Sequence, residues 1–343
     1  MDHGGFLCSI FVLWLLASSF SFGTLAGAQG IGVNYGMLGN NLPTPDKVVA
    51  LYTSRNVEKL RIFNPDLNAL KALEGSKIEV ILGTYNQDLQ SLASNQSYAT
   101  NWVQTNVIPF ANSVNFRYIN AGNEVIPGDL ASHVLPAMQN LDAAVKAANI
   151  SIPVTTAVAT AVLGTSYPPS QGAFSESASS FMAPIVAFLE AQKYPLLVNA
   201  YPYFAYAGSP NEVRLDYALF TAQGVVVKDG QLGYTNLFDA IVDATYSALE
   251  KAGGSNVEIV VSETGWPSGG GGVGATVDNA RTYNNNMVAY ALNKTGTPKR
   301  PGKGIETYLF AMFNENQKPA GTEQNFGLYR PDMTEVYHVD FSS

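Results

Sequence analysis

Two glutamates that end apolar, β-branched runs are the residues best suited to do chemistry in this chain. Glu263 directly follows the run 257–262 and is followed by a Gly-Trp-Pro turn. Glu124 follows a second such run, 116–121, and has Asn123 immediately before it. A buried, ionised carboxylate is costly to desolvate, so it usually has either a partner or a function. Taken alone, a strand-end glutamate is more often a structural or salt-bridged group.

A pair of carboxylates facing each other across one cleft is the minimal equipment for glycoside hydrolysis. In the retaining mechanism one carboxylate attacks the sugar and the other protonates the leaving oxygen, with the carboxyls about 5–5.5 Å apart. Asn123 is suited to bind a sugar 2-hydroxyl beside Glu124. The alternative interpretation of Asn123 and Glu124 is a helix cap or a turn. The choice depends on the elements that position both glutamates.

Short apolar runs alternate with helical patterns along the chain, which predicts an α/β fold. The predicted strands are 31–35, 59–63, 79–83, 116–121, 152–158, 196–201, 258–262 and 307–313. Helical patterns between them include 46–55, 130–148, 181–192, 237–252 and 279–292. Eight strands in this alternation favour a (β/α)₈ TIM barrel, with a doubly wound open sheet as the alternative. No glycine-rich dinucleotide fingerprint follows the first strand, which disfavours the alternative.

Three long connections follow predicted strands and therefore belong to the catalytic face of a barrel. They are 164–172 after the fifth strand, 208–233 after the sixth and the glycine-rich 268–276 after the seventh. The connection after the sixth strand is long enough for a small subdomain. In a barrel, the fourth and seventh strands also direct Glu124 and Glu263 toward one cleft.

The first 28 residues have the pattern of a secretory signal peptide. An apolar run at 6–20 precedes an Ala-Gly-Ala cleavage pattern at 26–28, although the leader lacks Lys and Arg. Residues 29–343 are then expected to form one domain, exported to the extracellular or cell wall space rather than the vacuole. A lipid anchor is not expected, because the last residues do not form the apolar tail that signals one. Asn95, Asn149 and Asn293 begin glycosylation sequons, which matter only if the chain is secreted.

Net charge and the content of cysteine and histidine limit the classes of partner and site that we expect. The formal net charge is −8, which argues against nucleic acid and anionic membranes and fits a neutral substrate. The single cysteine, Cys8, lies in the leader, and His133 and His338 are the only histidines beyond it. A disulfide, a thiol nucleophile and a metal site are therefore not expected. A monomer is expected.

Motifs spread over residues 31–341 make the chain similar to the plant β-1,3-glucanases of glycoside hydrolase family 17. They include Asn-Glu-Val at 123–125, Val-Val-Ser-Glu-Thr-Gly-Trp-Pro-Ser at 260–268 and Met-Phe-Asn-Glu-Asn-Gln-Lys at 312–318. The resemblance implies cofactor-free, retaining endo-hydrolysis of (1→3)-β-D-glucan. It assigns the nucleophile to Glu263 and the acid/base to Glu124. It further implies supporting roles for Glu315, Lys318 and Glu323, with Glu323 as the alternative proton donor.

A lysine between these carboxylates is expected to hold them ionised and to lower their pKa values. The alternative for these three residues is a surface ion-pair cluster. Aromatic side chains near the strand ends offer flat faces for glucose rings, although core packing is equally compatible with each one. Among them we expect substrate contacts from Tyr35, Tyr201 and Phe204.

Two segments depart from the family pattern and leave the linkage preference open. Phe63 stands where relatives often carry tyrosine, and 83–87 differs from the commoner Val-Pro pattern. A (1→3,1→4)-β-glucanase on the same scaffold is therefore an alternative. A second alternative is a catalytically weak, glucan-binding defence protein, which the presence of both glutamates, Asn123 and Lys318 disfavours. A structural wall protein is disfavoured because the chain has no low-complexity repeats.

Overall fold

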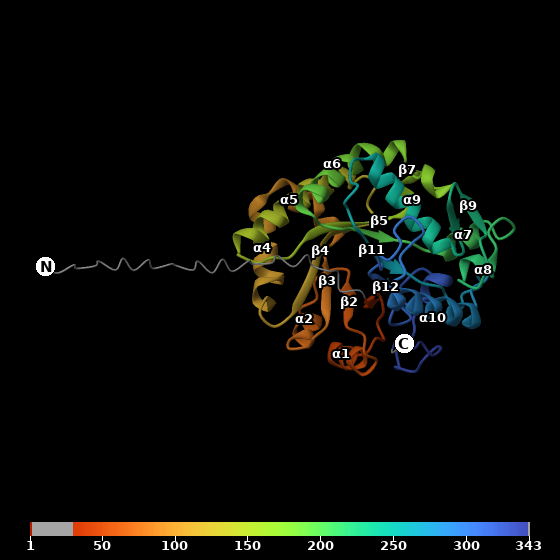
Figure 1. Cartoon of the computed structure of the whole chain (residues 1–343). Helices are drawn as coiled ribbons and strands as arrows, with labels where there is room; N and C mark the ends of the chain where they lie inside the picture. The colour runs from red at the N-terminus through yellow and green to blue at the C-terminus, as the bar shows by residue number, and fades with distance from the viewer. Residues whose placement is uncertain (2–29, 342–343) are drawn as a thin grey trace.

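The computed structural model of this chain describes Met1 and residues 30–341. The predicted signal peptide falls almost wholly on residues outside that range. Within it, eight parallel strands close into a barrel, as the sequence predicts (Figure 1). The strands are β1 Ile31–Asn34, β2 Lys59–Ile62, β3 Glu79–Gly83, β4 Asn115–Asn123, β5 Val154–Ala159, β8 Leu196–Asn199, β11 Ile259–Thr264 and β12 Thr307–Leu309.

Helices cover the outside of the barrel. They are α1 Pro45–Ser54, α2 Leu67–Leu73, α3 Leu89–Ser94, α4 Gln96–Asn106, α5 Ala131–Ala147, α6 Glu176–Gln192, α9 Leu237–Lys251 and α10 Val277–Asn293. Several begin at a side-chain cap, as where Asn236 accepts from the backbone N–H of Asp239 at the start of α9. No described helix has the length and apolar character needed to cross a membrane.

The barrel has one apolar core outside and a smaller one inside. The outer core lies between the strands and the helices and takes in side chains from β1 through to Phe341. The inner layer is formed by six buried residues from six different strands: Ile81, Tyr118, Ala157, Leu197, Val260 and Tyr308. The interior is therefore packed, and a ligand must bind at one end of the barrel.

Two of the three long connections form small elements after their strands, and the one after β8 is the connection for which a small subdomain was predicted. After β5, strands β6 Leu163–Thr165 and β7 Ala173–Phe174 make an antiparallel pair. After β8 come α7 Pro202–Gly208, α8 Leu215–Ala218 and the antiparallel pair β9 Val227–Asp229 and β10 Leu232–Tyr234. These last elements gather at one side of the barrel and share a small core of Tyr217, Tyr234 and Ala240 (Figure 1).

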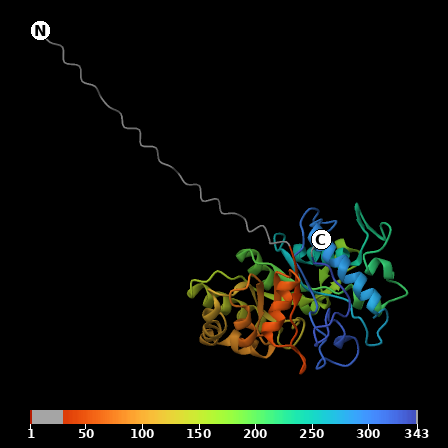
Figure 2. The same ribbon diagram turned by 90° about the horizontal axis from the view of Figure 1, so that it is seen from below.

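The first and last segments of the described chain lie side by side. Strand β1 pairs with β12, which closes the barrel. Below it, the Arg55 guanidinium donates to the Val339 carbonyl at 2.7 Å and pairs with Glu335 at 3.1 Å. Figure 2 shows the dark-blue C-terminal segment next to the orange N-terminal helices.

Both strands that carry the predicted glutamates are irregular where those residues lie. The register of β4 against β5 shifts between Asn120 and Asn123, and that of β11 against β8 shifts between Val261 and Glu263. Glu263 therefore lies within β11 rather than after it. Irregularities of this kind re-aim a side chain, and here they turn both glutamates toward the same end of the barrel.

Candidate active site

A cleft of about 1070 Å³ opens at the carboxyl ends of the barrel strands. All nine residues predicted to form a site line it: Tyr35, Asn123, Glu124, Tyr201, Phe204, Glu263, Glu315, Lys318 and Glu323. The structure brings these nine residues together in one cleft, and their roles stay predictions. Among the described residues, no group of His, Cys, Asp and Glu could hold a metal ion.

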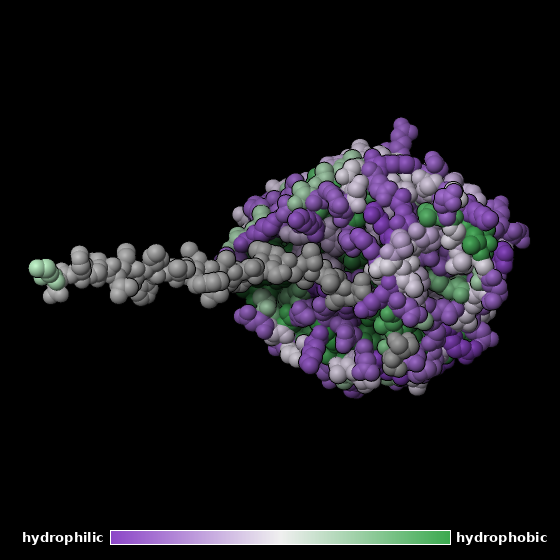
Figure 3. All heavy atoms as spheres, in the orientation of Figure 1, coloured by the Kyte–Doolittle hydropathy of each residue, from purple (hydrophilic) through white to green (hydrophobic). Residues whose placement is uncertain are grey.

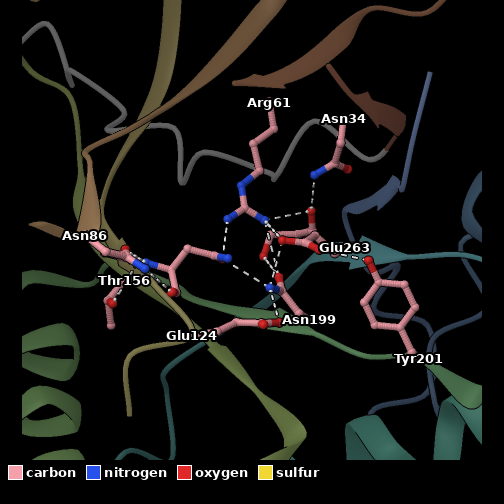
Figure 4. Close-up of polar contacts among 11 residues, drawn as sticks. Asn34, Arg61, Asn86, Glu124, Thr156, Asn199, Tyr201 and Glu263 are labelled. Carbon is pink, nitrogen blue, oxygen red and sulfur yellow. Dashed lines mark hydrogen bonds and ion pairs between the residues drawn. The ribbon is translucent and has the colours of Figure 1, made fainter. Parts of the chain in front are cut away.

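Glu263 is buried and surrounded by donors (Figure 4). Its Oε1 accepts from Arg61 at 2.9 Å and from the amide of Asn199 at 2.8 Å. Its Oε2 accepts from the Tyr201 hydroxyl at 2.8 Å. Burial raises the pKa of Glu263, while Arg61, Tyr201 and Lys318 oppose that shift by stabilising the ionised form. The carboxylate is thus held in one orientation by three donors.

Glu124 has a different environment, because its side chain is exposed to the cleft. Its backbone is left-handed, with φ of 54°, and its N–H donates to the Ala157 carbonyl at 2.9 Å. Its Oε1 accepts from Asn199 at 2.7 Å. One carboxylate is therefore buried among donors and the other is exposed, which is the arrangement that separates two carboxyl groups into two roles.

Asn199 links the two carboxylates, and the sequence analysis missed it. Its Nδ2 donates to both Glu124 and Glu263, and its Oδ1 accepts from the Ser262 hydroxyl at 2.8 Å and from Arg61 at 3.3 Å. Because these donors bind the carbonyl side of the amide, they turn the NH₂ group toward the carboxylates. The available signal was an amide at the end of the apolar run Leu196–Asn199.

Arg61 is the second residue that the sequence analysis missed. Its side chain is fully buried and reaches from β2 across the site, donating to the Ser262 carbonyl at 3.1 Å and to Asn123 Oδ1 at 2.7 Å besides Glu263. The ring of Phe63 lies 4.5 Å from the guanidinium carbon. A charged residue inside the buried strand Lys59–Ile62 was the signal, since such a charge needs partners.

The turn that carries Glu124 is tied to the loop after β3. Asn86 accepts from the N–H of Asn123 at 2.8 Å and donates to its carbonyl at 2.9 Å. Thr84 accepts from the N–H of Gly122 at 3.1 Å. These bonds satisfy the backbone groups that the register shift in β4 leaves unpaired, and they fix the position of Glu124.

Glu315, Lys318 and Glu323 form a second charged group beside the pair. Glu315 is buried and accepts from the N–H of Leu38 at 2.7 Å. It packs so closely on Gly36 that a Cβ there would come within 2.2 Å of Oε2, so only glycine fits. Lys318 Nζ lies 3.9 Å from Glu323 and 4.5 Å from the centre of the Phe310 ring.

Lys318 acts on the carboxylate pKa values in the predicted direction, but burial outweighs its effect at the two buried groups. Burial raises the pKa of Glu315, as it does that of Glu263, and Lys318 only reduces the shift. The physical reason is that both carboxyls lose most of their water, whereas one partly exposed ammonium restores only part of that solvation.

The three predicted aromatic contacts differ in what they offer to a ligand. Phe204 is 46% exposed, whereas Tyr35 is only 4% exposed and burial raises its pKa to about 12. Tyr201 points its hydroxyl at Glu263 and donates a hydrogen bond to it, so that only its ring is available to a ligand (Figure 4). A sugar contact at Phe204 therefore fits its exposure best, and those at Tyr35 and Tyr201 stay predictions.

A family model described as "Glycosyl hydrolases family 17" matches residues 31–341. The chain belongs to this family. A barley (Hordeum vulgare) protein named "Putative glucan endo-1,3-beta-glucosidase GVI" is 62% identical over 321 residues, which cover 93% of this chain and 99% of that protein. The protein described here is therefore a glycoside hydrolase, and the cleft is where its two glutamates meet.

Two solved structures of this family share the fold at high identity. One is CJP38, "a beta-1,3-glucanase and allergen of Cryptomeria japonica pollen", with a TM-score of 0.89 and 48% identity over 91% of this chain and 99% of that one. The other belongs to a study of "two plant beta-glucan endohydrolases with distinct substrate specificities", with a TM-score of 0.87 and 47% identity over 90% and 100%. The barrel and its cleft are thus those of plant glucan hydrolases.

Proposed function

We propose that this family 17 hydrolase cleaves internal (1→3)-β-D-glucosidic linkages of β-1,3-glucans with retention of configuration. Glu263 is the nucleophile and Glu124 the general acid/base. The observation that carries the proposal is the single amide nitrogen of Asn199 bound to both carboxylates, one buried and one exposed. The linkage is supported by the printed names of the barley relative and of CJP38.

The separation of the two carboxylates supports retention. Both bound oxygens lie on one nitrogen, so they are no farther apart than the sum of 2.7 and 2.8 Å. Two carboxylate oxygens this close together are compatible with the ~5–5.5 Å between the carboxyl groups of retaining glycosidases, which supports retention.

The environments of the two glutamates support their separate roles. Glu263 attacks the anomeric carbon, and Glu124 gives its proton to the leaving oxygen, which forms a glycosyl ester on Glu263 and releases the shortened chain. Glu124 then takes a proton from water, which displaces Glu263. Arg61, Asn199 and Tyr201 stabilise the ionised Glu263 before attack and after release.

Asn123 is placed to support the transition state. Its Oδ1 accepts from Arg61 at 2.7 Å and from Asn199 at 3.1 Å. This fixes the amide so that its NH₂ group is left to donate to the sugar 2-hydroxyl, a contact that strengthens as charge develops at the anomeric carbon.

A mixed-linkage (1→3,1→4)-β-glucan is the second candidate substrate. It is favoured by the phrase "distinct substrate specificities" in the description of one related structure and by the departures at Phe63 and 83–87. The complete set of carboxylates and donors disfavours a glucan-binding protein with weak catalysis.

Hydrolysis of laminarin and of mixed-linkage glucan by the purified protein tests the substrate and the stereochemistry together. We expect short β-1,3-oligosaccharides from laminarin, slower release from mixed-linkage glucan, and the β-anomer as the first product seen by ¹H NMR. Faster mixed-linkage cleavage would replace the substrate assignment, and an initial α-anomer would overturn retention. No reducing sugar from either polymer would remove the hydrolase proposal while leaving glucan binding open.

Glu124→Gln tests the acid/base role. It should slow natural glucans far more than aryl glucosides with activated leaving groups, because only a poor leaving group needs the proton. Glu323→Gln is the matched control, since Glu323 is the alternative donor. Equal slowing of both substrate types by Glu124→Gln would remove Glu124 from that role.

We extend the proposal to secretion into the extracellular or cell wall space and to N-glycosylation. The support is the leader pattern together with the exposure of Asn95, Asn149 and Asn293, all of which lie at the protein surface. Deglycosylation of the protein isolated from its own tissue, followed by mass spectrometry, identifies the sites in use. An unprocessed N-terminus in that material would contradict secretion.

A further inference from the structure

Tyr85 is an exposed aromatic side chain in the cleft that the proposed mechanism does not use. It lies in the loop after β3, lines the cleft, and is 43% exposed. Exposed large apolar side chains are few among residues 30–341, and the face drawn in Figure 3 is mainly hydrophilic with small apolar patches. Three of them line this one cleft: Leu38, Tyr85 and Phe204.

The ring of Tyr85 stands apart from the other aromatic rings of the cleft. Five of those rings form one connected cluster through edge and tilted contacts of 5.2–6.5 Å: Phe63, Tyr201, Phe204, Phe310 and Phe326. Neither a ring contact nor a hydroxyl hydrogen bond involves Tyr85 within the described range. Neither aromatic packing nor a hydroxyl hydrogen bond therefore explains its place in the cleft.

The backbone that carries Tyr85 is nevertheless firmly held. Its carbonyl accepts from the N–H of Asp88 at 3.1 Å, and both neighbours, Thr84 and Asn86, bond to the β4 turn of Glu124. A side chain on so constrained a loop loses little backbone freedom on binding, which is the preorganisation that a ligand-contacting residue needs.

Tyr85 and Phe204 lie on different sides of the catalytic pair. In the barrel, β4 and β5 stand between β3, which precedes Tyr85, and β8, which precedes Phe204. Glu124 at the end of β4 is thus flanked by one exposed ring on each side. Asn64 and Asp66, from the loop after the neighbouring β2, line the Tyr85 side and supply polar groups for sugar hydroxyls.

We infer that Tyr85 forms an additional glucosyl-binding subsite, in which its ring stacks on the C–H face of a glucose unit close to the cleaved bond. This inference rests on the proposed function and identifies a contact that binds a longer chain on the side opposite Phe204. A glucose ring has an apolar face and a polar edge, which match an aromatic ring bordered by Asn64 and Asp66. Binding on both sides of the carboxylates also favours cleavage within a chain over cleavage at its end.

The test compares Tyr85→Ala and Tyr85→Phe with the wild type on laminarin and on a short aryl β-glucoside. Tyr85→Ala should raise KM for laminarin about three- to tenfold, as expected for the loss of one aromatic stacking contact. Its kcat and its activity on the short substrate should stay near the wild-type values. Tyr85→Phe should behave as the wild type, because the ring is retained. Tyr98→Ala is the matched control, since Tyr98 is 37% exposed on α4 and outside the cleft lining.

A binding measurement separates the subsite from the hydrolase proposal. Laminari-oligosaccharides of increasing length are titrated by calorimetry into Glu263→Ala and into Glu263→Ala/Tyr85→Ala. We expect the double variant to lose the affinity gained on lengthening the ligand, with an unchanged melting temperature. The subsite would be overturned if the single and double variants bound oligosaccharides of every length with equal affinity. It would also be overturned if Tyr98→Ala, added to Glu263→Ala, caused the same loss of affinity. Failure of the wild type to cleave laminarin would instead overturn the proposed function and leave this binding result standing.

Discussion

The barrel holds two charged clusters, one at each end, and they differ in how well their charges are matched. At the amino ends of the strands, Lys59 and Arg117 face Glu79 and Glu306, with nitrogen–oxygen distances from 2.5 to 3.7 Å. The Tyr308 hydroxyl adds a bond to Glu306 at 2.8 Å. Two cations meet two anions, so no charge in this cluster needs a ligand.

At the carboxyl ends the balance is uneven. One guanidinium, that of Arg61, directly contacts Glu263, and Glu124 receives only the neutral amide of Asn199. Strand β2 supplies a cation to each end of the barrel. Lys59 and Arg61 are two residues apart and therefore point to the same side of the sheet, with Lys59 nearer its amino end and Arg61 nearer its carboxyl end. We infer that the cluster with equal numbers of cations and anions stabilises the fold. The cluster with an excess of carboxylates leaves one of them available to a ligand in the cleft.

The largest effect should come from removing Glu263, the proposed nucleophile. Glu263→Ala should lower turnover at least about 10³-fold, because the covalent route is lost. The fold should persist, since Arg61 keeps acceptors at Asn123, Asn199 and the Ser262 carbonyl. Reducing-sugar assays and thermal melting check both statements, and added azide should yield a glycosyl azide from activated substrates. Normal turnover in this variant would remove Glu263 from the mechanism.

Removing a charge from the matched cluster should lower stability and leave turnover nearly unchanged, which is the reverse of the result expected for Glu263→Ala. Glu306→Gln removes the more buried of the two anions and leaves Glu79 to face both Arg117 and Lys59, which should cost about 3 kcal/mol of unfolding free energy. Turnover at temperatures well below melting should stay within about twofold of the wild type, because Glu306 lies at the end away from the cleft. Denaturant titration and kinetics on the same preparation test this. An unchanged stability, or a selective loss of kcat, would undo the distinction between the two clusters.

A smaller effect should follow from Tyr201→Phe, which keeps the ring and removes the hydroxyl. The hydroxyl stabilises ionised Glu263, so its loss should raise the pKa of Glu263 further. Glu263 must be ionised to attack, and activity falls as the pH drops through its pKa. The acid limb of kcat/KM should therefore move to higher pH, with a loss of about tenfold at the optimum. A profile identical to that of the wild type would mean that Tyr201 acts through its ring alone.

The smallest effect is expected from Lys318→Met. The ammonium opposes the burial-driven rise in the pKa of Glu263 from outside its contact shell. Its removal should move the acid limb in the same direction as Tyr201→Phe but by less, with only a few-fold loss of activity. A larger shift than that of Tyr201→Phe would show that the mismatch depends on Lys318 as much as on the direct contacts of Glu263.

Much of the fold could be predicted because its signals are local. Apolar runs separated by helical periodicity indicate strands and helices, and strict alternation leaves few arrangements other than a barrel. Glu124 and Glu263 were found for the same reason, since each is a charge at the end of an apolar run. Asn199 and Arg61 carry the same kind of signal, but it was weaker, because an amide or an arginine near a strand end has many ordinary uses.

The sequence by itself determined the order of the elements, the two carboxylates and the family to which the chain belongs. Only the tertiary structure decided which donors surround Glu263, how the register shifts in β4 and β11 aim the two side chains, and that Tyr201 engages its hydroxyl. These are relations between residues that are distant in the chain, such as the bond of Arg61 to Asn123, 62 positions apart, and that of Asn34 to the Ser262 carbonyl, 228 positions apart. Burial, which raises the pKa of Glu263, likewise arises only when distant strands close around it, so no local pattern could reveal it.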